Sequence, residues 1–275
     1  MARRSIPGHL VVIEGPDGVG KTTVAVNLAI ALHRLGAKTG LMDADVYGPN
    51  VPTMLGTTEQ PRALSEREIE PVVAHGLKMI SMGLLNPGDK PLIWRGPMLH
   101  SVLQQFLRSV LWGELDYLIV DLPPGTGDVQ LSLIQTTHIT GAVVVTTPSQ
   151  VALADVRKAI EMFRQLNLDI LGIVENMSYF DPPAAGPSAG GAKPPRQYIF
   201  GEGEGRRMAA AFGVPLLGEI PLDAGIRVGG DSGAPVAAGG ESAPGAAPFY
   251  AIARTVAARC EEVSAAAGAP VVQID

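Results

Sequence analysis

The sequence of 275 residues contains a single cysteine, Cys260, and it lacks both a long apolar run and an excess of basic residues. One cysteine excludes an internal disulfide, and no CxxC or Cys/His spacing suggests a zinc or iron–sulfur site within one chain. No apolar stretch approaches the about 18 residues that a membrane span needs, so we expect no membrane partner. The net charge of −6 disfavours a general nucleic-acid-binding surface and favours small anions and proteins as partners.

The length suits one α/β domain, because single domains of this class commonly reach about 250 residues. We therefore expect residues 1–275 to form a single domain. The N-terminal residues MARR lead directly toward an apolar run without the pattern of a cleaved leader, so we expect a cytoplasmic protein.

Short apolar runs alternate with segments of helical period, the pattern of a mainly parallel sheet with helices on both faces. The sequence therefore predicts an α/β fold with helices at residues 24–35, after Gly96, and at residues 151–166. Strands are predicted at residues 9–13, 39–42, 77–81, 117–121, 142–146, 170–174 and 216–219. Apolar side chains at helical spacing predict the buried helix faces, namely Val102, Leu103, Phe106, Leu107, Val110 and Leu111 after Gly96, and Val156, Ile160 and Phe163 in the later helix.

Two stretches rich in Gly, Ala and Pro interrupt this pattern. Residues 181–196, DPPAAGPSAGGAKPPR, cannot bury enough apolar surface to offset their ordering entropy, so we expect a mobile loop. Residues 232–248 are similar in composition and lead into a last helix, predicted at residues 249–267, which carries Cys260.

The segment VVIEGPDGVGKTT, residues 11–23, lies between a predicted strand and a predicted helix and matches the phosphate-loop pattern GxxxxGK[ST]. Glycines let successive backbone N–H groups close around phosphate oxygens, and the helix presents its positive N-terminal end to the same anion. Lys21 would reach the β- and γ-phosphates, and the Thr22 hydroxyl would ligate Mg²⁺. The predicted nucleotide-binding residues of this loop are Gly15, Pro16, Asp17, Gly18, Val19, Gly20, Lys21, Thr22 and Thr23.

Two carboxylates, Asp43 and Asp45, follow the predicted strand 39–42 and precede a Gly-Pro turn. Strand ends of a parallel sheet face its ligand crevice. A carboxylate there could hold a Mg²⁺-bound water or position the water that attacks the γ-phosphate. The alternative is a turn-capping aspartate, and the phosphate loop upstream favours the functional role.

A third apolar strand ends in Asp121, within YLIVDLPPGTGD. An acidic residue at the end of such a strand is the usual partner of the nucleotide's Mg²⁺, as in a Walker B motif. The Pro-Pro-Gly that follows fixes φ at two residues and frees it at the third, which suits a loop that senses the γ-phosphate and rearranges when it leaves. With the phosphate loop upstream, this motif indicates a nucleotide hydrolase.

Seven segments follow one another in the order typical of one family, namely DADVYGPNVPTMLG, VDLPPGTGDVQLSL, VALADVRKAIEMF, VENMSYF, YIFGEGEG, GVPLLGEIPLD and GGDSGAP. Over residues 10–258 the chain resembles the Mrp/NBP35 family of MinD-like P-loop ATPases, which are iron–sulfur cluster carriers or assembly scaffolds. The resemblance implies an ATP-binding fold and a homodimer with nucleotide between its subunits. It also implies iron–sulfur apoproteins or assembly proteins as partners.

The resemblance also assigns roles to particular residues. It implies that Asp43, Asp45 and Asp121 serve Mg²⁺ and water, with Lys21, Asp45 and Asp121 as the catalytic residues. Asn176, in VENM, lies where relatives contact the base. The alternative for Asn176 is a strand-end amide that bonds local backbone.

The phosphate loop departs from the family pattern KGGVGKS, whose first lysine reaches the nucleotide of the partner subunit. Pro16 occupies that position here, so the trans lysine is missing. Removing a charge that stabilises the γ-phosphate in the transition state can lower the rate by orders of magnitude, so we expect slow hydrolysis. Arg95, in WRGP, is a candidate substitute, and a structural arginine is the alternative because RGPM also belongs to the family pattern.

The chain also lacks the usual cluster ligands. Many family members carry CPxC after NMSYF, where this chain has Asp181, Pro182 and Pro183. Oxygen ligands suit soft iron–sulfur clusters poorly, so we identify no iron–sulfur ligands. Two copies of Cys260 would supply at most two thiolates. Some members of the family also have a proline-rich loop here, so a role in the same pathway is compatible with the change.

Three functions fit these observations. The leading one is slow ATP hydrolysis in iron–sulfur cluster assembly or transfer to apoproteins. The second is a nucleotide kinase, because EGPDGVGKTT alone resembles the loop of thymidylate-kinase-like enzymes, in which Asp17 would lie near the phosphoryl acceptor. The chain lacks the Arg-rich lid and DR-type element of such kinases. The third is a non-catalytic switch or scaffold that binds ATP and dimerises, which the missing trans lysine favours.

Overall fold

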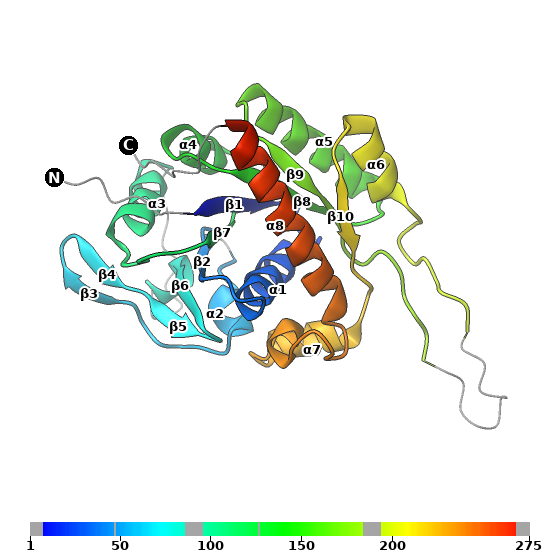
Figure 1. Ribbon diagram of the computed structural model, residues 1–275, viewed down its shortest axis with the longest axis horizontal. Coiled ribbons are helices and arrows are strands. Elements are labelled where there is room, and N and C mark those ends of the chain that lie inside the picture. The colour runs from blue at the N-terminus through cyan, green and yellow to red at the C-terminus, as the bar shows by residue number, and fades with distance from the viewer. Residues whose placement is uncertain (1–7, 47, 86–95, 126, 184–193, 268–275) are drawn as a thin grey trace.

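The computed structural model describes residues 8–46, 48–85, 96–125, 127–183 and 194–267. Within them, eight strands form one sheet in the order β10-β9-β8-β1-β7-β2-β6-β5, in which only β5 is antiparallel to its neighbour (Figure 1). The strands of this sheet are β1 (His9–Glu14), β2 (Thr39–Asp43), β5 (Val72–Ala74), β6 (Leu77–Ser81), β7 (Tyr117–Asp121), β8 (Gly141–Thr146), β9 (Ile170–Glu175) and β10 (Leu216–Glu219). A separate hairpin pairs β3 (Arg62–Ser65) with β4 (Glu68–Glu70).

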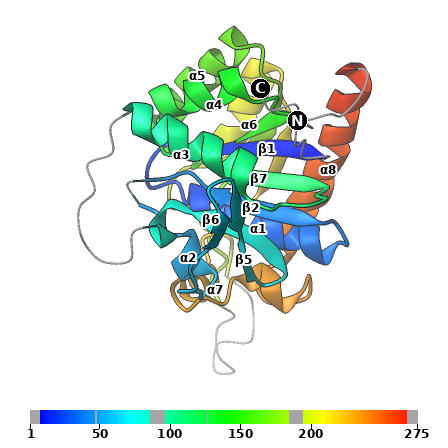
Figure 2. The same ribbon diagram turned by 90° about the vertical axis from the view of Figure 1, so that its left-hand side faces the viewer.

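Helices cover both faces of the sheet, as Figures 1 and 2 show. One face packs against α1 (Lys21–Arg34), α2 (Val51–Met54), α7 (Ala224–Asp231), the short helix η3 (Val236–Gly239) and α8 (Ala247–Ala267). The other face packs against α3 (Gly96–Ser109), α4 (Asp128–Thr136), α5 (Gln150–Gln165) and α6 (Glu204–Phe212). A further short helix, η1 (Met82–Leu84), follows β6.

The central strands are buried on both faces because successive side chains point into opposite cores. In β1, Val11 and Ile13 belong to the core under α1 and α8, whereas Leu10 and Val12 belong to the core under α3 and α5. This arrangement explains why the strands appear in the sequence as continuous apolar runs rather than as alternating ones.

All seven predicted strands are confirmed, with ends that differ by one residue at most. The predicted helix 24–35 corresponds to α1, residues 151–166 correspond to α5, and the last helix begins at Ala247 rather than at Phe249. In α5 the predicted inner residues Val156, Ile160 and Phe163 are fully buried.

The helix after Gly96 is α3, and it ends at Ser109, before the last two residues of its predicted face. Leu103, Phe106 and Leu107 are buried as predicted. Val110 is buried beyond the helix end, and Leu111 donates a backbone hydrogen bond of 2.8 Å to the Ile69 carbonyl.

The predicted mobile loop lies partly outside the described residues, which omit residues 184–193. Its two ends are held together by a bridge between Phe180 and Gln197. Arg196 pairs with Asp181 at 3.0 Å and lies 3.4 Å from the centre of the Tyr179 ring. These contacts therefore fix the two ends of the loop to each other.

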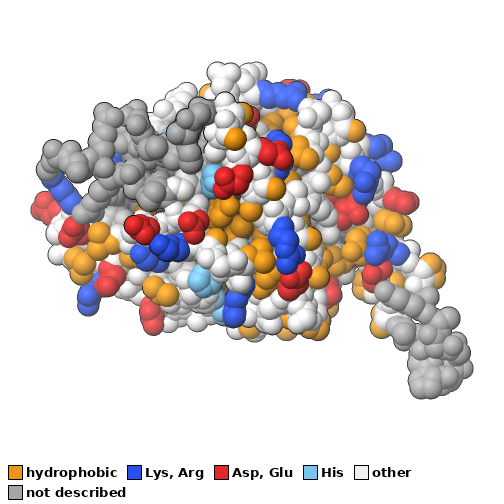
Figure 3. Space-filling view, viewed as in Figure 1, with side chains coloured by type: hydrophobic (Ala, Val, Ile, Leu, Met, Phe, Trp, Pro, Cys, Tyr) orange, Lys and Arg blue, Asp and Glu red, His pale blue; other side chains and the backbone are white. Residues whose placement is uncertain are grey.

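The face that carries α8 mixes side chains of both charges (Figure 3). Arg254 of α8, for example, pairs with Glu241 at 2.6 Å. Among the described helices, none is both long enough and apolar enough to cross a membrane.

Candidate functional site

The phosphate loop, residues 15–20, joins β1 to α1 and depends on glycine at three places. Gly18 and Gly20 have φ angles of 79° and 76°, in the left-handed region that favours glycine. At Gly15 a side chain would not fit, because a Cβ would lie 2.6 Å from the carbonyl oxygen of Val145 in β8. The backbone therefore requires glycine where the phosphate-loop pattern has it.

A pocket of about 390 Å³ opens beside this loop, within the size range of ligand sites. It is lined by Pro16, Asp17, Gly18, Gly20, Lys21, Thr22, Thr23, Asp45, Gly48, Asn50, Met54, Pro124 and Met177. Most of the predicted loop residues thus face one pocket, whereas Gly15 and Val19 are buried behind it. Carboxyl ends of strands and the start of α1 converge there, as expected for a parallel sheet.

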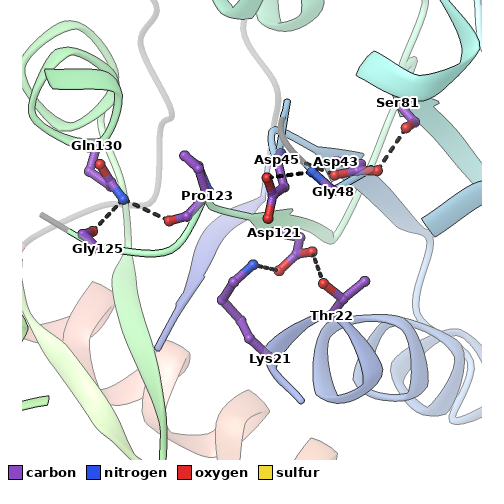
Figure 4. Close-up of polar contacts among 10 residues, drawn as sticks. All are labelled: Lys21, Thr22, Asp43, Asp45, Gly48, Ser81, Asp121, Pro123, Gly125 and Gln130. Atoms are coloured by element: carbon purple, nitrogen blue, oxygen red, sulfur yellow. Dashed lines mark hydrogen bonds and ion pairs between the residues drawn. The ribbon is translucent and has the colours of Figure 1, made fainter. Parts of the chain in front are cut away.

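Asp121 ends β7 beneath the loop and accepts hydrogen bonds from the first two residues of α1 (Figure 4). Lys21 Nζ donates to Asp121 Oδ1, and the Thr22 hydroxyl donates to Oδ2 over 2.7 Å. Asp121 is fully buried and Lys21 is 6 % exposed, so little water screens the ion pair. The strand end and the phosphate loop that the sequence predicts to act together are therefore in direct contact.

Asp43 is the last residue of β2 and Asp45 comes just after it, but the two lie in different environments. Asp43 is fully buried and accepts hydrogen bonds from the Ser81 hydroxyl at 2.7 Å and from the Asp45 backbone N–H at 3.1 Å. Asp45 lines the pocket and accepts a hydrogen bond of 3.2 Å from the Gly48 N–H. Both aspartates thus make the turn-capping contact that the sequence left as an alternative, and Asp45 is the one that also lines the pocket.

Burial raises the pKa values of the acidic groups beneath the pocket. Burial, and then the charge of Asp121, raises the pKa of Asp43 from 3.8 to about 8, against hydrogen bonds from Ser81 and Asp45. Burial also raises the pKa of Asp121, although Lys21 and Thr22 favour its ionised form. Because a nearby positive charge favours the ionised form of a buried carboxyl group, a further cation beside Asp43 and Asp121 would be stabilised there.

The oxygen atoms of this site fit Mg²⁺ only when a bound nucleotide supplies further ligands. Among the described residues, no three His, Cys, Asp or Glu side chains are arranged to hold a metal ion by themselves. Protein sites for Mg²⁺ commonly use one or two carboxylates together with phosphates and water. Thr22, Asp45 and Asp121 provide hard oxygen atoms of this kind at or just behind the pocket wall.

Asn176 follows β9 and bonds the phosphate loop. Its Nδ2 donates to the Val19 carbonyl over 2.7 Å, and the residue is 6 % exposed. A Cβ on Gly20 would lie 2.5 Å from this Nδ2, which is a second reason for glycine there. The Asn176 amide therefore bonds backbone, but this backbone belongs to the phosphate loop and not to the strand that precedes Asn176. Contact with a base stays a prediction, and the next residue, Met177, lines the pocket.

Two buried polar residues beside the loop were missed by the sequence reasoning. Glu14 ends β1 and is 1 % exposed, and its Oε2 has no hydrogen-bond partner among the described residues. Gln130, in α4, is also 1 % exposed, and its Nε2 donates to the carbonyl oxygens of Pro123, at 2.7 Å, and of Gly125 (Figure 4). An acidic residue directly after an apolar run was the available signal for Glu14, and Gln130 gave none.

Glu14→Gln is expected to stabilise the protein at neutral and alkaline pH. Burial raises the pKa of Glu14 from 4.5 to about 8, against the lowering effect of Lys21. Between these values the unfolded chain releases a proton that the folded protein retains, so rising pH lowers the wild type's free energy of unfolding. The amide does not ionise. We expect the variant to melt about 3 °C or more above the wild type at pH about 8, with a difference that shrinks toward pH about 4.5.

Scanning calorimetry across this pH range measures the effect, with Glu66→Gln as the matched control. Glu66 lies on the exposed turn between β3 and β4, so its substitution should leave the melting temperature unchanged. Titration of Asp43 is common to all three proteins and cancels in the comparison. Equal melting temperatures of Glu14→Gln and the wild type at pH about 8 would contradict the expectation.

Pro16, Arg95 and Cys260 are the residues that bear on the two departures from the family pattern. Pro16 lines the pocket, and Arg95, the candidate substitute for the missing lysine, lies outside the described residues. Cys260 is fully buried in α8, and burial raises the pKa of its thiol to about 12. Because clusters are held by thiolates, Cys260 in this position does not fit a cluster ligand.

The chain is similar to known proteins in sequence and in fold. Residues 5–257 match the family model described as NUBPL iron-transfer P-loop NTPase. The iron-sulfur cluster carrier protein of Deinococcus radiodurans is 52 % identical over 257 residues, which are 92 % of this chain and 71 % of that protein. The nucleotide-binding protein of Archaeoglobus fulgidus, solved in complex with ADP, is 36 % identical with a TM-score of 0.71, covering 88 % of this chain and 92 % of that one.

The fold has a further solved counterpart in the cell division ATPase MinD of Pyrococcus furiosus. The two chains are 23 % identical with a TM-score of 0.64, over 90 % of this chain and 98 % of that one. The predicted α/β fold of the MinD-like P-loop type is therefore confirmed.

Proposed function

Since the chain belongs to the Mrp/NBP35 family of P-loop NTPases, we propose that it binds ATP beside the phosphate loop, hydrolyses it slowly, and acts in iron–sulfur cluster assembly or transfer to apoproteins. The observation that carries this proposal is the contact of Asp121 with Lys21 and Thr22 at the pocket. It joins a strand-end carboxylate to the lysine and hydroxyl of a phosphate loop. P-loop enzymes use this combination to hold the phosphates and the metal of a nucleotide.

Each residue of the loop has a distinct task in this proposal. The backbone N–H groups of residues 15–20 and the start of α1 bind the phosphate oxygens. Lys21 would move from Asp121 toward the β- and γ-phosphates, which would leave both Asp121 oxygens to orient Thr22 and to help hold Mg²⁺. Mg²⁺, when bound with ATP, would neutralise charge on the β- and γ-phosphates.

Asp45 is our candidate for positioning the attacking water, because it is the strand-end carboxylate that lines the pocket. Asp43 lies behind it and fixes the turn through the Asp45 backbone N–H. We infer that Asp43 affects the metal through this turn rather than by direct contact. Asn176 holds Val19 in place, and together with Met177 it marks where we expect the base.

Slow hydrolysis is proposed because Pro16 replaces the lysine that would reach across to the partner subunit's nucleotide. Without that charge, one source of transition-state stabilisation is absent. A homodimer with nucleotide at its interface remains our proposal for the assembly, and the cytoplasm for its location.

The iron–sulfur cluster is the cargo of the protein in this proposal. The described residues offer the buried Cys260 and, after NMSYF, the oxygen ligands of Asp181 and its neighbours, which do not fit the cluster. We therefore propose an accessory role in which thiolates from a client or assembly protein hold the cluster, while ATP binding controls the encounter.

One experiment separates these activities. ATP turnover by the purified protein is measured with and without thymidylate as acceptor, and Mg·ATP binding is measured by calorimetry. The protein is then incubated anaerobically with iron and sulfide, and its absorbance is recorded with and without a cysteine-bearing apoprotein.

We expect binding, slow turnover that thymidylate does not change, and a cluster spectrum only when the apoprotein is present. Phosphorylated thymidylate would instead establish the kinase alternative, which the exposed Asp17 at the pocket keeps open. Binding without turnover would favour the switch or scaffold. A stable cluster on the protein alone would overturn the accessory role.

A further inference from the structure

Gln130 connects α4 to the segment that follows Asp121. Its Nε2 donates to the Pro123 carbonyl over 2.7 Å and to the Gly125 carbonyl, so one amide group holds the first and last carbonyl groups of the Pro-Pro-Gly segment. Between these two anchors lies Pro124, which lines the nucleotide pocket. The position of this pocket wall therefore depends on a side chain that does not itself line the pocket.

Glu14 is the second polar group at this place. The Gln130 side chain and the Gly15 backbone N–H are its hydrogen-bonding neighbours, and within the part of the chain that the structure describes its Oε2 has no partner. An amide nitrogen carries two hydrogens. Three acceptors, the Pro123 carbonyl, the Gly125 carbonyl and the Glu14 carboxyl, lie near the Gln130 amide, so its two hydrogens can serve only two of them at a time.

The surroundings make this competition sensitive to charge. The groups that face Glu14 are Lys21 from α1, Asp121 from β7 and Gln130 from α4. Burial raises the pKa of Glu14 to about 8, so the carboxyl is neutral at lower pH and leaves the amide hydrogens to the two carbonyls. An ionised Glu14 is the stronger acceptor and draws one hydrogen away.

We propose that Gln130 is a positioning residue of the nucleotide site, which holds residues 123–125 against the pocket, and that Glu14 competes with those residues for its amide hydrogens. The proposal rests on the proposed ATPase function. It couples the end of β1, where the phosphate loop begins, to the segment after β7. Leu122 strengthens this coupling, because its N–H donates to the Ile13 carbonyl over 3.2 Å.

The test compares Gln130→Met with a matched control, Gln104→Met. Both variants lose a hydrogen-bonded glutamine amide, which is buried at Gln130 and half-buried at Gln104, but the Gln104 amide donates to Thr136 between α3 and α4, away from the pocket. Three quantities are measured, namely the dissociation constant of Mg·ADP, the rate of ATP turnover, and amide hydrogen exchange in peptides that span residues 117–125.

For Gln130→Met we expect turnover to fall about tenfold or more, because displaced positioning groups cost rate rather than binding. The dissociation constant of Mg·ADP should change by less than about threefold. Exchange in residues 117–125 should become faster by about tenfold, since the carbonyl anchors are gone. Gln104→Met should leave this exchange as it is in the wild type.

Glu14→Gln provides a measurement that would not change if Glu14 had a purely structural role, namely the pH dependence of turnover. Because the competing charge is gone, the variant's turnover should exceed that of the wild type about threefold at pH about 9, and this excess should vanish at pH about 6. In the wild type, the rate of amide hydrogen exchange in residues 117–125, corrected for its intrinsic pH dependence, should rise between pH about 6 and pH about 9. In Glu14→Gln the corrected rate should stay constant over this range.

Unchanged exchange in Gln130→Met would overturn the proposal, and so would a loss of turnover that is fully explained by weaker Mg·ADP binding. Identical pH profiles of Glu14→Gln and the wild type would overturn the part assigned to Glu14. A wild type that binds Mg·ADP but turns over no ATP would count against the proposed hydrolysis. In that case the exchange measurements still decide whether Gln130 and Glu14 position this segment.

Discussion

Lys21→Ala is expected to weaken Mg·ATP binding by about 100-fold or more, because the ammonium that would pair with the phosphates is removed from a site with little water. Lys21 is 6 % exposed and faces an acidic group that is fully buried. Its loss also leaves Asp121 without a cation, which costs about 3–5 kcal/mol of stability when the carboxyl stays charged. Calorimetric titration with Mg·ATP measures the first effect and thermal unfolding the second.

Lys38→Ala is the matched control for Lys21→Ala. Lys38 also pairs with a carboxylate, Glu114, at 2.9 Å, but both side chains are mostly exposed, at 63 % and 81 %. Such surface pairs contribute about 1 kcal/mol or less. We expect Lys38→Ala to bind Mg·ATP as the wild type does. Circular dichroism establishes that each variant is folded before titration, and a folded Lys21→Ala protein that binds like the wild type would contradict the proposed site.

The sheet could be predicted from the sequence because its strands are buried on both faces. In β7, all five residues from Tyr117 to Asp121 are buried, and this produces a continuous apolar run with an acidic end. The strands that were missed, β3, β4 and β5, are only three or four residues long. Every residue of β3 is exposed, and β4 and β5 bury one residue each, so no apolar run is long enough to mark them.

The phosphate loop and Asp121 could be predicted because their chemistry is local to one loop or one strand end. The partners of Asn176 and Ser81 could not, because each reaches a segment that only folding brings near. Gln130 bonds carbonyls only seven and five positions earlier in the chain, but no motif marks this glutamine. Asn176 bonds Val19, which lies 157 positions earlier in the chain, and Ser81 bonds Asp43, 38 positions earlier. Glu14 was missed for a related reason, since its importance comes from burial without a full set of partners rather than from a motif.

Asp121→Asn is expected to reduce ATP turnover by about 100-fold to about 1000-fold while leaving the binding of metal-free ADP within about threefold of the wild type. The carboxylate accepts hydrogen bonds from Lys21 Nζ and from the Thr22 hydroxyl at 2.7 Å. An amide of the same shape offers one acceptor, and its NH₂ group would face the other donor. Either the lysine or the hydroxyl that should ligate Mg²⁺ then loses its orientation.

The diagnostic quantity for Asp121→Asn is the gain in ADP affinity on adding Mg²⁺, measured by titration calorimetry with the metal present and with EDTA. We expect this gain to be largely lost in the variant, because Thr22 and Asp121 act on the metal rather than on the phosphates. Asp116→Asn is the control, since Asp116 is exposed just before the other end of β7 and bonds the Lys38 backbone at 2.7 Å. If Asp121→Asn keeps both the Mg²⁺-dependent gain and its turnover, Asp121 does not serve the metal, and its contact with Lys21 and Thr22 is structural.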